Sequence, residues 1–108
     1  MTFFTDGSKS NEGVGVAAVG ANRVLSTRIQ ANASIFTAEL CAIKKAIQQC
    51  DENTIAIVCT DSRSSIQSVQ IYLNPHPIVQ EIQQVIQNRT EFTSLCWIPS
   101  HIGVAMNE

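Results

Sequence analysis

Three acidic residues, Asp6, Glu39 and Asp61, are the side chains of this sequence best suited to bind a metal ion. Asp6 and Asp61 each follow an apolar, strand-like run, within the similar segments Thr-Asp-Gly-Ser and Thr-Asp-Ser. Ligand sites in open α/β sheets gather at the carboxyl ends of strands, where both aspartates are expected. Carboxylate oxygens suit Mg²⁺, with Mn²⁺ as a substitute, so the pattern predicts a divalent-metal site.

Glu39 is expected on a helix, near its apolar stripe. At 100° per residue it falls about 20° from Cys50 and about 40° from Ile43, so it points toward the sheet. An ionised carboxylate on a buried flank is costly unless it is neutralised, and a cation shared with the two aspartates would neutralise it. Taken singly, each acid has an alternative role: Asp61 as a helix N-cap, Asp6 as a turn residue, and Glu39 as a flank residue reaching water.

The elements that position these acids follow from hydrophobic periodicity. Residues 2–6, ending at Asp6, residues 14–19 and residues 23–30 predict three strands joined by short turns, which is typical of an antiparallel meander. Ser34 is expected to cap a helix that ends at residues 51–53. Its apolar face has helical spacing and consists of Phe36, Leu40, Ile43, Ile47 and Cys50.

The second half of the chain alternates strands and helices. Residues 54–60 are apolar at successive positions, which predicts a central strand covered on both faces. A short helix opened by Asp61 or Ser62 is marked by Ile66, Val69 and Leu73, and a third helix ends near Asn88. Residues 92–98 form the last expected strand. The predicted fold is therefore α/β, a three-stranded antiparallel meander followed by α/β crossovers, with a five-stranded mixed sheet flanked by helices.

Composition limits the classes of function. With 108 residues, of which 44 % are hydrophobic, the chain is expected to form one domain. It has no apolar stretch long enough for a membrane span and no secretory signal, so we expect an intracellular protein, cytoplasmic or nuclear, without a membrane partner. Its four cysteines lack the Cys-x-x-Cys spacing of zinc and redox motifs, which favours reduced structural thiols.

A formal net charge of −2 argues against binding nucleic acid through a general excess of positive charge. Any such binding must use a local patch, metal ions or neighbouring domains. Lys9, Lys44, Lys45 and Arg63 are candidates for phosphate contacts, although scattered single charges are usually only solvated. Trp97 is expected in the core rather than as a platform for base stacking.

An ordered set of motifs runs along the chain. It comprises Phe-Thr-Asp-Gly-Ser at residues 4–8, Phe-Thr-Ala-Glu-Leu at 36–40, Thr-Asp-Ser at 60–62, Trp-Ile-Pro-Ser-His-Ile-Gly-Val at 97–104, and Asn-Glu at 107–108. In this order and spacing the set resembles type 1 ribonuclease H, most closely the domain of non-LTR retrotransposon polyproteins. The resemblance covers essentially the whole chain.

The resemblance implies both an activity and roles for residues. Asp6, Glu39 and Asp61 are similar to three of the family's four metal-binding acids, and His101 resembles its mobile histidine, associated with proton transfer or product release. A solvated loop histidine is the alternative for His101. The implied reaction is endonucleolytic cleavage of the RNA strand of an RNA–DNA hybrid, leaving a 3′-hydroxyl and a 5′-phosphate. The implied partners are the hybrid and a reverse transcriptase domain of the same polyprotein.

The chain departs from the family pattern at its end. The fourth acid, which starts the family's last helix, would come three positions after Glu108. We therefore expect residues 1–108 to be a single ribonuclease H-like domain lacking its C-terminal helix, either as a fragment or as a shortened protein. The alternative function is that of a catalytically impaired module that serves nucleic-acid binding or scaffolding.

Overall fold

A five-stranded mixed sheet and three helices form the described part of the fold. The computed structural model describes residues 1–10, 13–20, 24–30 and 32–99. Its elements are β1 (Thr2–Ser10), β2 (Gly13–Gly20), β3 (Val24–Ile29), α1 (Ile35–Gln49), β4 (Ala56–Thr60), α2 (Arg63–Gln70), α3 (Pro77–Gln87) and β5 (Thr93–Trp97). This order confirms the predicted sequence of strands and helices.

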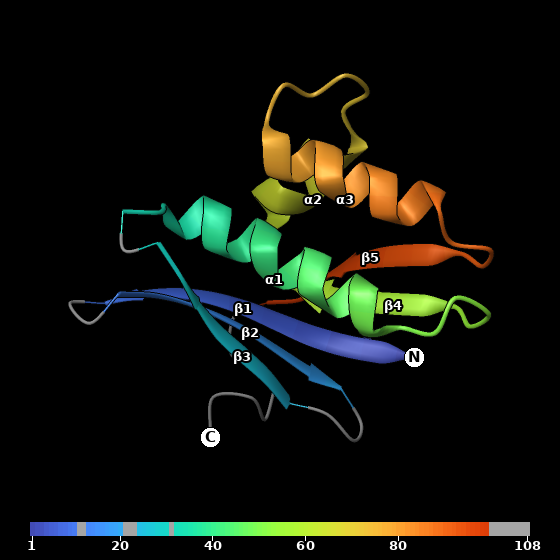
Figure 1. Ribbon diagram of the computed structural model, residues 1–108, viewed down its shortest axis with the longest axis horizontal. Helices are drawn as coiled ribbons and strands as arrows, with labels where there is room; N and C mark the ends of the chain where they lie inside the picture. Colours follow the sequence, from blue (N-terminus) through green and yellow to red (C-terminus); the bar gives the residue numbers. More distant parts are fainter. Residues whose placement is uncertain (11–12, 21–23, 31, 100–108) are drawn as a thin grey trace.

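The sheet has the strand order β3-β2-β1-β4-β5. The first three strands form an antiparallel meander, whereas β1 pairs with β4, and β4 with β5, in parallel. A parallel pair requires a crossover connection, which α1 supplies between β3 and β4, and α2 with α3 between β4 and β5. Figure 1 shows the three helices on one side of the sheet. The predicted α/β class and mixed sheet are thus confirmed.

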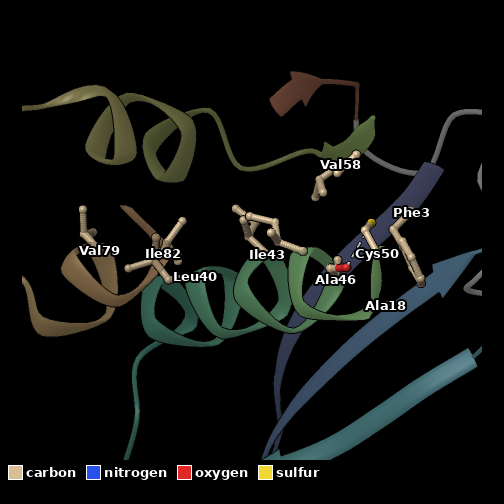
Figure 2. Packing of buried hydrophobic residues seen from close by; sticks show 11 residues of the cluster. Phe3, Ala18, Leu40, Ile43, Ala46, Cys50, Val58, Val79 and Ile82 are labelled. Carbon is tan, nitrogen blue, oxygen red and sulfur yellow. Dashed lines mark hydrogen bonds between the residues drawn. The ribbon is translucent and has the colours of Figure 1, made fainter. Parts of the chain in front are cut away.

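The hydrophobic core lies between the sheet and helices α1 and α3. Leu40, Ile43 and Ile47 of α1 are at most 1 % exposed and pack with Val79 and Ile82 of α3. Figure 2 shows this helix core facing Phe3, Ala18 and Val58, which come from β1, β2 and β4. The inward stripe of α1 therefore has the helical period that the sequence predicted.

Successive side chains of β4 point to opposite faces of the sheet. Ala56 and Val58 are fully buried against the helices, while Ile57 and Cys59 point to the opposite face of the sheet. The sequence also predicted that this second face is covered, and that stays a prediction.

Arg89, which follows α3, donates hydrogen bonds to the backbone carbonyls of Cys50 (3.1 Å) and Thr54. It thereby ties the end of α3 to the segment that leads into β4.

The predicted extent of the second helix was wrong. Helix α2 ends at Gln70, and Leu73 lies beyond it, 78 % exposed and with a left-handed φ of 62°. The side-chain amide of Asn74 donates to the carbonyl of Ser68 (3.3 Å), and that of Gln83 donates to the carbonyl of Val69 (3.0 Å). These side chains satisfy carbonyl groups that a further helical turn would have used.

His76 fixes the start of α3. It is the N-cap of α3, because its Nδ1 accepts a hydrogen bond from the backbone N–H of Ile78 at 3.1 Å.

The four cysteines are free thiols. Within the described ranges, none of the helices has the length and apolar character required to cross a membrane.

Candidate metal centre

Three carboxylates from three different elements meet at the carboxyl end of β4. Asp6 lies on β1, Glu39 on α1, and Asp61 directly after β4. Each offers an oxygen atom, and these atoms all lie within 4.8 Å of one another. The structure thus brings together the three acids that the sequence singled out.

Strand register explains why the two aspartates are neighbours. In the parallel pair of β1 and β4, Phe4 is opposite Cys59. Asp6 and Asp61 each lie two residues beyond this pair, so strand alternation places them on the same face. The hydroxyl of Thr5, which is 4 % exposed, donates to the carbonyl of Cys59 at 3.3 Å and holds the two strands together there.

The predicted end of the first strand was wrong. β1 continues past Asp6 to Ser10, because its backbone pairs with β2 through Asp6 opposite Ala17 and onward to Ser10 opposite Gly13. Asp6 therefore lies within a strand rather than at its end. It marks the place where β1 has passed its last pair with β4 and remains paired only with β2.

A close approach of α1 to β1 positions Glu39. Ser34 caps the helix by accepting a hydrogen bond from the backbone N–H of Thr37 at 3.0 Å. Glu39 follows in the second turn, directly against Gly7 of β1. A Cβ at Gly7 would lie 2.6 Å from the backbone nitrogen of Glu39 and 2.7 Å from the carbonyl carbon of Ala38. Only glycine permits this contact, so Gly7 sets the distance between Glu39 and Asp6.

Glu39 is a buried carboxyl group in a negative environment. It is 7 % exposed, and its Oε2 has no hydrogen-bond partner among the described residues. Burial, followed by the charges of Asp61 and Asp6, raises its pKa from 4.5 to about 7, against a hydrogen bond from the Gly7 backbone that lowers it. A buried, unpartnered oxygen beside two further carboxylates is the donor set that a hard divalent cation requires, so these residues fit such an ion.

Trp97 and Arg63 stack beside the backbone of Asp61, a feature that the sequence did not predict. The indole N–H of Trp97 donates to the backbone carbonyl of Asp61 at 3.3 Å. The guanidinium carbon of Arg63 lies 4.4 Å from the centre of the Trp97 ring. Trp97 is 46 % exposed, so its expected place in the core was wrong. It is the last residue of β5 and is not among the residues that pack against the core under α1 and α3, whereas Leu95 of the same strand is.

The turn after β4 is fixed by hydroxyl groups. The backbone N–H of Ser62 donates to the hydroxyl of Thr60 at 3.0 Å, and Ser62 caps α2 through a bond from the N–H of Ser65. Of the two caps that the sequence allowed, Ser62 is therefore the one used, which leaves the Asp61 carboxylate directed to the metal site. His101 lies outside the described residues, so its role stays a prediction.

Comparison with known proteins agrees with this geometry. A family model described as RNase H matches residues 1–108, the full length of the chain. A comparison with curated proteins found no match.

Proposed function

The chain belongs to the RNase H family, and we propose that it hydrolyses the RNA strand of RNA–DNA hybrids as an endonuclease that depends on Mg²⁺, or on Mn²⁺ in its place. The observation that carries the proposal is the meeting of Asp6, Glu39 and Asp61, whose carboxylate oxygens lie within 4.8 Å of one another, together with the buried Oε2 of Glu39 that has no hydrogen-bond partner among the described residues. In such a site a bound divalent ion lowers the pKa of water and stabilises charge on phosphoryl oxygens.

The chain's own residues would contribute orientation and charge. Asp6 and Asp61 are fixed by paired strands, and Glu39 by the contact of α1 with Gly7, so the carboxylate oxygens need little rearrangement to bind cations. We propose that Asp6, Glu39 and Asp61 are the metal ligands. The RNA strand would be recognised by its 2′-hydroxyl groups, and cleavage would leave a 3′-hydroxyl and a 5′-phosphate.

Finer assignments rest on the motifs. We propose His101 as the group that assists proton transfer or product release. The similarity of the motifs supports a domain of the non-LTR retrotransposon type, with a reverse transcriptase domain of the same polyprotein as partner. We propose that such a protein acts in the cytoplasm or nucleus.

The test is cleavage of an end-labelled hybrid with Mg²⁺, for the parent and for Asp61→Asn, with Asp51→Asn as the matched control. Asp51 is the one aspartate of the sequence outside the proposed site, and it is exposed after α1. We expect the parent and Asp51→Asn to cut only the RNA strand, and Asp61→Asn to lose at least about a hundredfold in rate. Binding of hybrid without cleavage by the parent would instead support the alternative, a catalytically impaired module for nucleic-acid binding or scaffolding.

A further inference from the structure

The carboxylate site creates an electrostatic difficulty for a nucleic-acid substrate. Three acids gather at one place in a chain whose formal net charge, these acids included, is −2. A substrate phosphate must approach this site, and like charges repel strongly where solvent is partly excluded. A positively charged side chain beside the site would offset this repulsion. It would act on those phosphates of the nucleic-acid backbone that bound metal ions do not contact.

Most basic side chains in the described part of the chain are engaged or distant. Lys44 forms an ion pair with Glu81 at 2.9 Å, and Arg89 is committed to backbone carbonyls. Arg28 lies on β3, the edge strand two places from β1. Lys45 is six residues further along α1 than Glu39, about 9 Å away along the helix axis.

Arg63 differs from these residues in position. It is the first residue of α2, two positions after Asp61, and it is exposed. Its guanidinium rests over the ring of Trp97, at 4.4 Å from the centroid, and the same indole donates to the backbone carbonyl of Asp61. Trp97 therefore links the guanidinium to the backbone of a carboxylate residue of the site.

Stacking of this kind prepares an arginine to bind an anion. A guanidinium that rests on an aromatic face keeps N–H donors at its edge, in a fork that matches two phosphate oxygens. Because the ring already restrains the side chain, less conformational entropy is lost when a phosphate binds. Exposure of both groups leaves the donors accessible to a large substrate.

We propose that Arg63, held on Trp97, binds a backbone phosphate of the nucleic-acid substrate beside the carboxylate cluster. The inference rests on the proposed function, since it assumes a nucleic-acid substrate at this site. Trp97 acts as a positioning residue that orients Arg63 and is hydrogen-bonded to the backbone of Asp61. Arg63 itself touches the substrate but none of the reacting atoms.

The test compares the parent with Arg63→Ala, Arg63→Lys and the matched control Arg28→Ala, which loses one positive charge on the edge strand β3. Binding of a short, fluorescein-labelled RNA–DNA hybrid is measured by anisotropy in EDTA at several salt concentrations, and steady-state cleavage is measured with Mg²⁺. We expect Arg63→Ala to weaken binding and raise KM about tenfold, with kcat changed less than about twofold. The slope of log affinity against log salt should decrease in magnitude by about one phosphate contact.

The conservative variant and the fluorescence of Trp97 separate contact from structure. Arg63→Lys should retain most of the salt slope but recover only part of the affinity, because an ammonium group lacks the planar fork. Trp97 is the sole tryptophan, so its emission should change when the parent binds unlabelled hybrid, and this change should be lost in Arg63→Ala.

Two results would overturn the inference. One is a salt slope and KM for Arg63→Ala equal to those of Arg28→Ala; the other is a fall in kcat at unchanged KM. A parent that binds hybrid through Arg63 but never cleaves it would refute the proposed activity alone. Failure of the function and failure of the phosphate contact are therefore distinguishable.

Discussion

The raised pKa of Glu39 makes the stability of the metal-free protein depend on pH. The carboxyl group is 7 % exposed, and burial is the largest cause of the rise of its pKa from 4.5 to about 7, followed by the charges of Asp61 and Asp6. The substitution Glu39→Gln removes this titratable group and keeps the shape of the side chain. Glu52→Gln, at an exposed position after α1, is the matched control.

The sign follows from proton binding in the two states. Between pH 4.5 and about 7 the folded protein retains a proton on Glu39 that the unfolded chain has released. The contribution of Glu39 to the free energy of unfolding is therefore largest below pH 4.5 and falls as the pH rises toward about 7. A difference of about 2.5 pKa units, at about 1.4 kcal/mol each, predicts a loss of about 3 kcal/mol by pH 8. This is a large part of the 5–15 kcal/mol that is typical for a domain.

The assay is urea unfolding at pH 5 and pH 8 in EDTA, followed by circular dichroism. We expect the parent to lose about 2.5 kcal/mol more than Glu39→Gln between these two pH values, because part of the full loss has already occurred at pH 5, while Glu52→Gln follows the parent. Adding Mg²⁺ at pH 8 should restore stability to the parent and much less to Glu39→Gln. Equal pH dependence in the parent and Glu39→Gln would refute the burial and coupling assigned to Glu39.

Three further substitutions test how the site is held. Gly7→Ala should destabilise the fold by about 2 kcal/mol and weaken Mn²⁺ binding, because the new Cβ would displace α1 from β1; urea unfolding and metal titration measure both effects. Ser62→Ala should cost about 1 kcal/mol in urea unfolding through loss of the α2 cap, and wild-type stability would contradict that role. Arg89→Ala should cost about 2 kcal/mol by leaving the carbonyls of Cys50 and Thr54 without their donor, with Arg89→Lys intermediate in the same unfolding assay.

Local periodicity was sufficient to predict the candidate site. The helical spacing of α1 placed Glu39 near the buried stripe, and the structure confirms that it is buried. Residues two apart in a strand share a face, so Asp6 lies with Phe4 and Asp61 with Cys59, and the pairing of Phe4 with Cys59 makes the two aspartates neighbours. These inferences needed only the direction in which side chains point along an element, and that is a local property.

Features set by contacts distant in sequence were beyond such reasoning. The extension of β1 past Asp6 depends on its pairing with β2, and the end of α2 depends on Gln83, which is supplied by α3. The stacking of Arg63 on Trp97 joins residues 34 positions apart. Trp97 was expected in the core, yet it lies at the end of β5, where it does not pack against the core cluster. That outcome depends on how the helices pack on the sheet and not on the neighbours of Trp97 in the chain.

The central claim is that Asp6, Glu39 and Asp61 together hold a divalent metal ion. The most direct measurement is titration of the protein with Mn²⁺, with the free ion followed by electron paramagnetic resonance. The parent and Asp51→Asn should bind Mn²⁺ equally, whereas Asp6→Asn and Asp61→Asn should each bind at least about tenfold more weakly. Competition by Mg²⁺ should release the bound Mn²⁺. Binding by Asp6→Asn and Asp61→Asn that equals the parent's would contradict the claim, because the metal would then be held elsewhere.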